Sequence, residues 1–473
     1  MTSTSGSEHS AWPPASTARA PASGTPRERR AVRLPVQRGP AAWSAILPGQ
    51  PAPVAVDRDM TADFAIVGGG FAGLAAARRL AQLNPGATIV VLEAGRLAEG
   101  ASGRNSGFMI DLPHDIASDD YSGHGADADR GQIALNRHAI AFAREAVDTY
   151  GVPADYFDPA GKVNGAASES ADALNRSYAR HLTELGEPCE RLDSQAMFEL
   201  TGSRHYLSGL YTPGTVMLQP AGYVRSLGEG LRRDGVRVFE TSPVRAMRRE
   251  GRSWDLATSG GRVRAGKVIL ANNGHLESLG FESRRLMHVF LYASMTVELD
   301  AEALGRLGGQ PRWGVTPSDP MGTTMRRIDT GQGGNRIVTR TCATFEPGME
   351  PTESSLRRTA AVHREKFEAR FPLLRGVDME HTWAGHLCLS RNGVSVMKQL
   401  EEGLWSACVC NGLGTTRSTL TGIGAAELAS GVESDVTRHF LTEPQPTKLP
   451  PPPFSTLGAN AYLRWKEWRA SRE

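Results

Sequence analysis

The sequence is poor in cysteine and contains no long apolar run. Its five cysteines are odd in number and lack a paired C-x-x-C spacing, which argues against a disulfide framework and a structural zinc site. No stretch of about 18 apolar residues is present, so no membrane-spanning helix is expected. These absences predict a soluble protein of a reducing compartment, the cytoplasm, with no metal site.

An excess of charge of one sign is also missing. The 53 Lys and Arg nearly balance the 51 Asp and Glu, which leaves no overall field to attract nucleic acid or an anionic membrane. A chain of 473 residues is too long for one compact core, so two domains are expected.

The first 40 residues contain few acids and few large apolar side chains. Residues 1–40 are rich in Ser, Ala, Pro and Arg, a composition that buries too little surface to offset the entropy of ordering. They also lack the apolar stretch of a secretory signal and the apolar stripe of a transit peptide. We therefore predict a disordered tail over 1–40. Residues 41–60 combine an apolar anchor around Trp43 with three prolines, which predicts an extended arm lying on the body.

What is present, directly after this arm, is a βαβ pattern. Residues 64–67 form a short apolar run that stops at glycines, as a buried parallel strand does. A helical pattern follows over 71–83, and a second β-branched run follows over 88–93.

A G-x-G-x-x-G turn joins the first strand to the helix. Gly68 permits the tight turn, Gly70 lets backbone approach a pyrophosphate, and Gly73 lets helix and strand pack closely. Glu93 ends the second strand, where a carboxylate accepts hydrogen bonds from ribose hydroxyls and repels the 2′-phosphate of NADP. A glycine-rich turn alone also occurs in nucleotide-free domains, but the complete unit favours dinucleotide binding. It does not separate FAD from NAD.

Three further features favour FAD. Residues 94–107 form a second loop of small residues with cations, long enough to wrap the pyrophosphate and reach a flavin. Residues 411–414 form a late glycine-rich turn before a helix, whose N–H groups can face the flavin N1/C2 edge. A buried strand over 268–271 runs into a loop and resumes the nucleotide fold mid-chain.

These motifs together resemble a known family. The glycine-rich turn, Glu93, the 100–107 loop, the 271–274 strand end, Trp383-Ala384-Gly385 and the 411–414 turn occur in the order typical of the FAD-dependent D-amino-acid-oxidase-like superfamily. The most similar branch contains the bacterial amine oxidoreductases similar to gamma-glutamylputrescine oxidase and the glycine and sarcosine oxidases. The resemblance covers about residues 43–470.

The resemblance implies an α/β (α+β) fold in which a Rossmann-like FAD-binding domain is interleaved with an antiparallel-sheet substrate domain. We expect the FAD-binding domain over 61–112, 208–282 and 381–435, the substrate domain over 113–207 and 283–380, and a C-terminal extension over 436–473.

We expect the cofactor FAD to contact residues drawn from all three segments of its domain. They are Gly68, Gly70, Phe71, Ala72, Gly73, Glu93, Ala94, Arg96, Ala101, Ser102, Arg104, Asn105, Ser106, Val244, Asn411, Gly412, Leu413, Gly414 and Thr415.

The chemistry implied is oxidation of a primary or secondary amine or an amino acid. Hydride passes from the α-carbon to flavin N5, the resulting imine is hydrolysed by water, and O2 is the expected acceptor. A dehydrogenase that passes electrons to a carrier, an NAD-dependent dehydrogenase and a non-catalytic FAD-binding subunit are the alternatives. The identity of the amine and the oligomeric state stay open.

Relatives that act on amino acids commonly bind the carboxylate with an Arg or Lys, because a guanidinium makes two parallel hydrogen bonds to it. The leading candidates are Arg326, in an expected strand of the substrate domain, and Arg417, after the late turn. Arg104, Arg327 and Arg340 are further candidates. The alternative for each is a solvated or ion-paired arginine.

His386 and Cys388 follow the Trp383 motif on one strand. His386 is a candidate for substrate positioning, or else a hydrogen-bonded core histidine. Cys388 is a candidate for covalent attachment of FAD, as in some sarcosine-oxidase-like relatives, or else a buried thiol. Three tyrosines are candidates for aromatic pocket walls or for plain core: Tyr206, Tyr211 and Tyr292.

Overall fold

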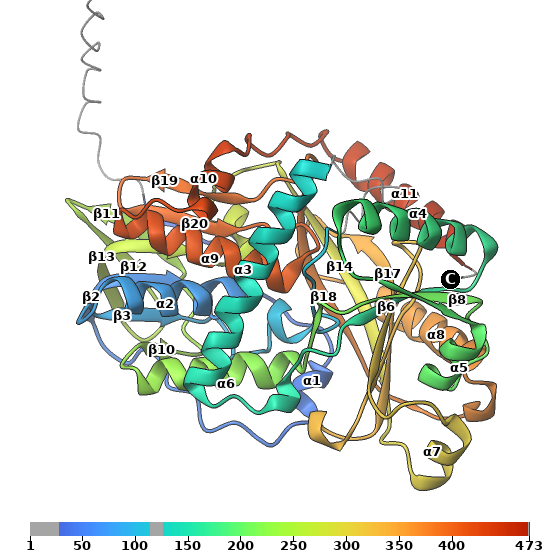
Figure 1. Cartoon of the computed structure of the whole chain (residues 1–473). Coiled ribbons are helices and arrows are strands. Elements are labelled where there is room, and N and C mark those ends of the chain that lie inside the picture. Colours follow the sequence, from blue (N-terminus) through green and yellow to red (C-terminus); the bar gives the residue numbers. More distant parts are fainter. Residues whose placement is uncertain (1–27, 114–125, 472) are drawn as a thin grey trace, which may run out of the picture.

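The computed structural model of the chain describes residues 28–113, 126–471 and 473. Two large sheets lie side by side, each covered by its own helices (Figure 1). The first sheet is built around parallel strands and the second around antiparallel strands. This is the mixed α/β architecture that the sequence predicts.

The first sheet has a parallel centre. Its strands are adjacent in the order β10 (Arg237–Phe239), β3 (Ile89–Leu92), β2 (Met60–Val67), β13 (Arg262–Leu270) and β20 (Leu404–Cys408). The last four residues of β2 and all of β3 are buried, which explains why they read as unbroken apolar runs. Sequence neighbours are not always sheet neighbours, so the nucleotide fold is assembled from separated segments.

Antiparallel strands extend this sheet from the edge of β13 that faces away from β2. The first part of β13 pairs with β12 (Ser253–Ala257), which is followed by β11 (Ala246–Glu250) and the short β1 (Arg29–Arg30). The last part of β13 pairs with β20, which in turn pairs with β19 (Val396–Glu401).

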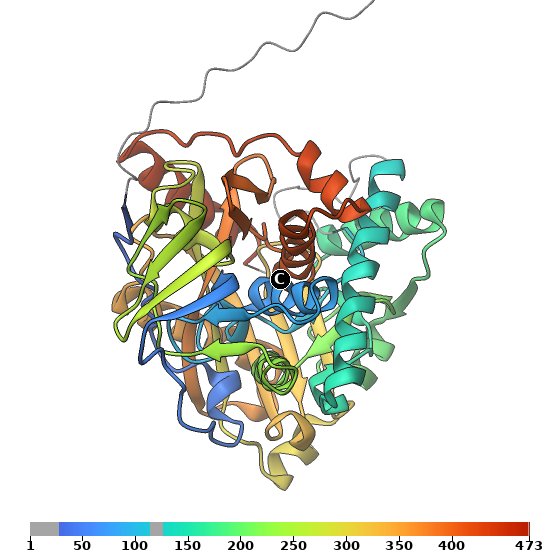
Figure 2. The same cartoon turned by 90° about the vertical axis from the view of Figure 1, so that its left-hand side faces the viewer.

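Helices α2 (Phe71–Leu83) and α9 (Gly414–Ser430) lie over the first sheet and pack against each other (Figures 1 and 2). A Cβ atom at Gly422 would lie 2.2 Å from the carbonyl oxygen of Ala72. The absence of a side chain at Gly422 therefore sets how closely the two helices approach. Three more helices complete this half of the molecule: α3 (Ala126–Tyr150), α6 (Pro220–Arg233) and α10 (Asp435–Thr442).

The second sheet has eight strands over the described residues. Their order is β18 (Met379–Ser390), β14 (Leu286–Thr296), β17 (Arg336–Phe345), β16 (Thr324–Ile328), β15 (Trp313–Pro317), β6 (Lys162–Ala166), β8 (Ser208–Thr212) and β7 (Glu190–Asp193). All neighbours are antiparallel except β15 and β6. Its helices are α4 (Glu169–Leu185), α5 (Ser194–Thr201), α7 (Ala301–Leu307) and α8 (Glu353–Arg370).

Short elements connect the two halves. The strands β4 (Phe108–Met109), β9 (Val216–Leu218) and β5 (Phe157–Asp158) form a small antiparallel sheet. The 3-10 turns are η1 (Ala101–Gly103), η2 (Ala154–Tyr156), η3 (Asn273–Leu279), η4 (Thr330–Gln332) and η5 (Pro372–Leu374).

The chain crosses between the sheets at slightly different points from those expected. Strands β8 and β18 belong to the second sheet, whereas the segments 208–282 and 381–435 were assigned to the FAD-binding domain. Strand β18 pairs with β14 along its whole length and only its end approaches the first sheet. In the C-terminal extension 436–473, α10 packs on α9 and α11 (Phe454–Arg469) packs on β17.

The N-terminal segment differs from the predicted disordered tail. Residues 1–27 lie outside the described part of the chain, but residues 28–40 follow a defined path. Strand β1 pairs with β11, and the Val32 N–H donates to the Ser278 carbonyl at 3.0 Å. The order comes from main-chain pairing with a sheet edge, a contact that composition does not report.

The arm over 41–60 begins with α1 (Ala42–Ala45) and a buried tryptophan. Trp43 is fully buried, and its Nε1–H donates to the Asn105 carbonyl at 2.8 Å. The Gln219 amide donates to the Trp43 carbonyl at 2.8 Å. The start of the arm is thus part of the core, whereas residues 51–55 are exposed.

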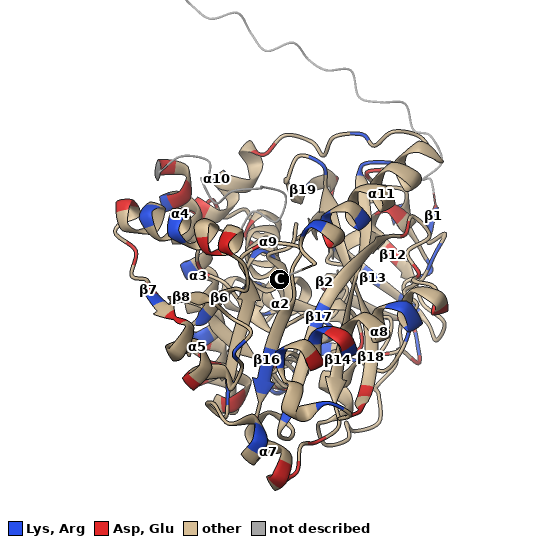
Figure 3. Cartoon of the chain, turned by 90° about the vertical axis from the view of Figure 1, so that its right-hand side faces the viewer, with Lys and Arg blue, Asp and Glu red and all other residues tan. Residues whose placement is uncertain are grey.

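Charged residues of both signs are interspersed over the helices of the second half, and two arginines mark β16 (Figure 3). None of the helices in the described part of the chain is both long and apolar enough to cross a membrane.

We predict that Trp43→Ala lowers the free energy of unfolding by about 3–5 kcal/mol, because it leaves a cavity where a large side chain is fully buried. Chemical denaturation followed by far-UV circular dichroism measures the change, because this signal does not depend on the tryptophan that is removed. Val54→Ala is the control in the same arm, since Val54 is 57% exposed. Equal stability of the two variants would contradict a core role for the arm.

Candidate active site

The glycine-rich turn leads from β2 into α2 without room for side chains. Gly68 has φ +111°, and a Cβ atom there would lie 2.6 Å from the Ala271 carbonyl oxygen. A Cβ atom at Gly73 would lie 1.8 Å from the Gly68 carbonyl oxygen. At Gly70 it would meet the Ser102 hydroxyl at 2.6 Å. The main chain is therefore open to a ligand at the start of α2, where N–H groups and the helix dipole favour phosphate.

Glu93 lies directly beyond β3, beside this turn. Its carboxylate accepts hydrogen bonds from the Gly69 N–H at 2.7 Å and the Gly95 N–H at 3.0 Å. Burial raises the pKa of Glu93, and the hydrogen bonds from backbone N–H groups oppose that rise. The carboxylate thus orders the turn and also faces the site expected for a ribose.

Two adjoining hollows meet at this turn. The first, which we call the dinucleotide cleft, is lined by residues 67–70, 92–96, 98–102, 243–244, 271–273 and 275 and by part of the N-terminal segment. The second, which we call the central pocket, lies between the start of α9 and the second sheet. Both share Gly70, Ala101, Ser102, Asn273 and His386, so one elongated ligand can occupy both.

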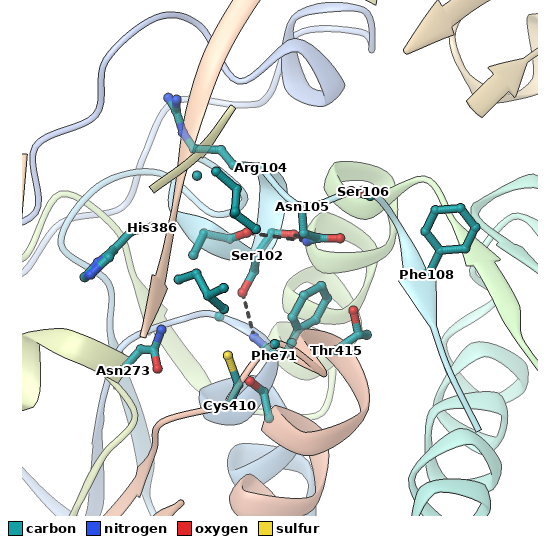
Figure 4. A pocket seen from close by; sticks show the side chains of 18 of the residues that line it. Phe71, Ser102, Arg104, Asn105, Ser106, Phe108, Asn273, His386, Cys410 and Thr415 are labelled. Carbon is teal, nitrogen blue, oxygen red and sulfur yellow. Dashed lines mark hydrogen bonds between the residues drawn. The ribbon is translucent and has the colours of Figure 1, made fainter. Parts of the chain in front are cut away.

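The central pocket brings together side chains from three distant parts of the sequence (Figure 4). Phe71 and Ser102 lie at its centre, and the Phe71 N–H donates to the Ser102 hydroxyl at 3.0 Å. Cys410 lies below them, Thr415 lies beside Phe71, and Phe108 lies on the side opposite His386 (Figure 4).

The late turn places the start of α9 at this pocket. Gly412, Gly414 and Thr415 line the pocket. Asn411 has φ +48° and holds the turn, because its amide accepts from the Ser390 N–H at 2.8 Å and donates to the Val394 carbonyl at 2.7 Å. The residue before the helix, Leu413, provides no side-chain cap, which leaves N–H groups at the helix start available to a ligand.

Arg104 lines the central pocket but turns its guanidinium away from Ser102 and Thr415 (Figure 4). The guanidinium donates to the carbonyls of Glu99 at 2.6 Å, Arg38 at 3.0 Å, Gly39 at 2.9 Å and Ala384 at 3.2 Å. Burial lowers the pKa of Arg104 to about 10. This arginine therefore fixes the loop that lines the cofactor site.

Arg326 and Arg417 are both engaged by protein partners. Arg326 is 1% exposed, and its guanidinium donates to the Leu218 carbonyl at 2.5 Å and to Gln332 at 2.9 Å. Arg417 pairs with Glu443 and donates to the Ser395 hydroxyl at 2.7 Å. Neither side chain belongs to the lining of the cleft or the pocket as far as the structure describes it.

Arg340 is the arginine that the geometry favours instead. It lies on β17 between Ala293 of β14 and Thr324 of β16, and it lines the central pocket. Over the described residues its guanidinium has no carboxylate or hydrogen-bond partner. The described lining of the pocket contains no Asp or Glu. Burial lowers the pKa of Arg340 to about 10, which leaves it cationic at neutral pH. The fifth candidate, Arg327, donates to the Gly308 carbonyl at 2.5 Å.

His386 belongs to a buried cluster beside both hollows. Its Nε2 lies 3.2 Å from Nδ1 of His288, whose Nε2 lies 2.8 Å from the Glu277 carboxylate. Phe290 stacks on the imidazole with 4.9 Å between ring centroids. Burial and the neighbouring His288 and His275 push the pKa of His386 well below 6.5. The low pKa favours the neutral imidazole of His386.

Cys388 is fully buried in the apolar cluster beneath the first sheet. Burial raises its pKa well above 9.0, which disfavours the thiolate needed for covalent chemistry. In the lining as described, the cysteine at the central pocket is Cys410. The hydroxyl of Tyr292 bonds to Thr344 at 2.7 Å at the wall of the same pocket, whereas Tyr206 and Tyr211 bond elsewhere, to Arg370 and the Ala160 carbonyl.

The structure brings most of the expected FAD contacts to the two hollows. The lining includes Gly68, Gly70, Phe71, Ala72, Glu93, Ala94, Arg96, Ala101, Ser102, Arg104, Asn105, Ser106, Val244, Gly412, Gly414 and Thr415. Gly73, Asn411 and Leu413 support the two turns from behind.

Sequence reasoning missed several lining residues. Asn273 and His275 follow β13, and the signal was the strand that ends before them. Phe108 and Ile110 extend the small-residue loop into β4. The N-terminal residues at the cleft carried no signal, because their composition is that of a tail.

Comparison with known proteins agrees with this geometry. The family model described as FAD dependent oxidoreductase (DAO) matches residues 63–428, and the chain belongs to this family. Its cofactor is therefore FAD. The bare main chain at Gly68 and Gly70 and the elongated pair of hollows fit this cofactor.

The chain is 24% identical over 420 residues to a "Probable oxidoreductase OrdL" of Rhizobium meliloti, covering 85% of this chain and 91% of that protein. It is 25% identical over 378 residues to the gamma-glutamylputrescine oxidoreductase of Escherichia coli, covering 80% and 85%. The crystal structure of glycine oxidase from Geobacillus kaustophilus superposes with a TM-score of 0.64 at 21% identity, covering 79% of this chain and 96% of that one. The last comparison shows a shared fold.

We predict that Glu93→Arg markedly lowers FAD occupancy, because it removes the acceptor beside the expected ribose and two bonds that order the turn. The ratio of flavin absorbance to protein absorbance after purification measures occupancy. Glu184→Arg, at an exposed position of α4, is the charge-matched control. Unchanged occupancy in Glu93→Arg would place the ribose elsewhere.

Acid should destabilise the histidine cluster. The pKa of His275 is lowered to about 4, and that of His386 is lowered well below 6.5. Below pH 6.5 the unfolded chain therefore binds more protons than the folded chain. Stability therefore falls as pH drops from 6.5 toward 4, by up to about 1.4 kcal/mol per pH unit for each histidine. Denaturant unfolding at several pH values should show a shallower slope for His386→Asn. The exposed control His138→Asn should keep the original slope, and equal slopes would refute the assignment.

Proposed function

We propose that the protein oxidises a primary or secondary amine that carries a carboxylate, such as an amino acid, with FAD as the hydride acceptor. The imine formed is hydrolysed by water, and O2 reoxidises the cofactor. The observation that carries the substrate class is Arg340, a cation that faces the central pocket and has no protein partner over the described residues.

The pocket's chemistry supports an anionic substrate group. A guanidinium binds a carboxylate through two parallel hydrogen bonds, and a partly desolvated site strengthens that interaction. The other pocket arginine, Arg104, uses its donors on main-chain carbonyls. The remaining lining is largely apolar and includes Phe108, Leu291 and Leu387. An amine with a carboxylate and an apolar body satisfies this combination.

Bound FAD supplies the two-electron acceptor for the C–H bond next to the amine nitrogen. Arg340 then binds the substrate carboxylate and fixes its orientation. The C–H bond next to the amine nitrogen therefore points in the same direction each time a substrate binds. The N–H groups at the start of α9, which lines the pocket, would stabilise negative charge on bound FAD. Because the pKa of His386 is low, this side chain adds no second positive charge to that of Arg340.

Two names among the relatives agree with this chemistry. Gamma-glutamylputrescine oxidoreductase is named for an amine linked to an amino acid, and glycine oxidase is named for an amino acid. Both support an amine with a carboxylate, and neither identifies the substrate of this chain.

The function is tested by adding amines to the anaerobic holoenzyme and following bleaching of the flavin absorbance. We expect bleaching with amino acids or carboxylated amines, and weaker bleaching with the same amines after amidation of the carboxylate. Peroxide formation in air identifies an oxidase, whereas bleaching without peroxide identifies a dehydrogenase. No bleaching by any amine would indicate a non-catalytic flavoprotein.

We predict that Arg340→Met raises KM for a carboxylated amine by about 10- to 150-fold, since a hydrogen bond to a charged group contributes about 1.5–3 kcal/mol. FAD occupancy should stay unchanged. The control is Arg364→Met on α8, whose side chain is 43% exposed and pairs with Asp378. An unchanged KM in Arg340→Met would move the carboxylate site to another residue.

A further inference from the structure

The dinucleotide cleft has one wall that the family match does not include. The cleft is lined by Ala31, Arg33, Leu34, Pro35 and Gln37, whereas the match begins at residue 63. We propose that residues 31–37 are part of the FAD site and act as a clasp that retains the bound cofactor. The proposal rests on FAD as the cofactor and is independent of the amine substrate.

The clasp is anchored at its first end to the first sheet. Arg29 pairs with Glu401 at 2.5 Å and lies over the ring of Phe281 at 4.1 Å from its centroid. The Ala31 N–H donates to the Arg245 carbonyl at 2.8 Å, which continues the pairing of β1 with β11. This end is thus fixed to the nucleotide-binding half.

At its second end the clasp is anchored near the second sheet. Arg38 forms ion pairs with Glu350 and Glu353, at the loop and first turn of α8. The carbonyls of Arg38 and Gly39 accept from Arg104. A Cβ atom at Gly39 would lie 2.4 Å from the Thr382 carbonyl oxygen, so the chain passes β18 at close range. The clasp therefore bridges the two halves across the cleft.

Between these anchors the clasp makes few contacts of its own. Val32 is 74% exposed and Val36 is 44% exposed. Arg33 donates to the Pro347 carbonyl at 3.3 Å. A segment with fixed ends and a lightly packed middle opens locally at low cost, which is what a ligand's entry and exit require. A bound ligand that contacts the middle would in turn hold it closed.

The charge of the clasp suits a ligand with a pyrophosphate. Arg33 adds a cation to the lining of a cleft that also contains the carboxylate of Glu93. Arginine is well suited to phosphate oxygens. The clasp thus offers both enclosure and charge to the half of FAD that does not take part in the chemistry.

The test is the rate at which the holoenzyme releases FAD, followed by the rise in fluorescence of free flavin after dilution. Deletion of residues 1–40 should speed release about tenfold or more, because one wall and its cation are lost. Deletion of residues 1–27 is the matched control and should leave the rate unchanged. Equal rates for the two truncated proteins would overturn the proposal.

A second set of variants keeps the full chain, in case the longer deletion impairs folding. Arg38→Glu reverses the ion pair with Glu350 and should speed FAD release, whereas the double variant Arg38→Glu/Glu350→Arg should restore it. Hydrogen exchange of residues 31–37 should slow when FAD is bound. Release at the original rate in Arg38→Glu, or exchange that is insensitive to FAD, would show that the segment is no part of the site. Neither readout depends on amine turnover, so a wrong substrate class would leave both unchanged.

Discussion

The hydrogen bonds of Arg104 connect the parts of the molecule that must meet around the cofactor. One guanidinium binds carbonyls of its own loop, of the N-terminal segment and of β18. The loop lines both hollows, β18 belongs to the second sheet, and the N-terminal segment lies across the dinucleotide cleft. Trp383 reinforces the junction by donating to the Arg104 carbonyl at 3.0 Å. The junction of the two halves is therefore held by a charged side chain that uses its donors on main-chain carbonyls, although the sequence also made it a candidate for binding the substrate.

Local rules predicted the nucleotide-binding half well because its signals are steric and close in sequence. Gly68 is required by its own φ of +111° and Gly73 by its contact with the nearby Gly68 carbonyl, and Glu93 follows a strand at a fixed spacing from them. The sequence also predicted that the second half is built on an antiparallel sheet. The crossing strands β8 and β18 were placed in the wrong half, because alternation and length look the same in either sheet.

The substrate pocket was harder to predict. The sequence alone does not distinguish Arg326, Arg340 and Arg417 as candidates. Their partners distinguish them: Arg326 donates to main-chain carbonyls, and Arg417 pairs with Glu443. Those partners lie far away in the sequence. The ordered path of residues 28–40 escaped prediction for a related reason, because its stability comes from a sheet edge and from Glu350 and Glu401. The composition of a segment indicates how much surface it can bury by itself, but not which contacts it makes with distant parts of the chain.

The close contact between α2 and α9 has a consequence for redox chemistry. Gly422 lies two turns into α9, yet its bare Cα sets the height of the whole helix above Ala72. A methyl group there would clash with the Ala72 carbonyl and displace α9, whose first residues line the central pocket and whose first N–H groups would face bound FAD. The electrostatic stabilisation of reduced FAD would therefore depend on a residue that lines neither hollow.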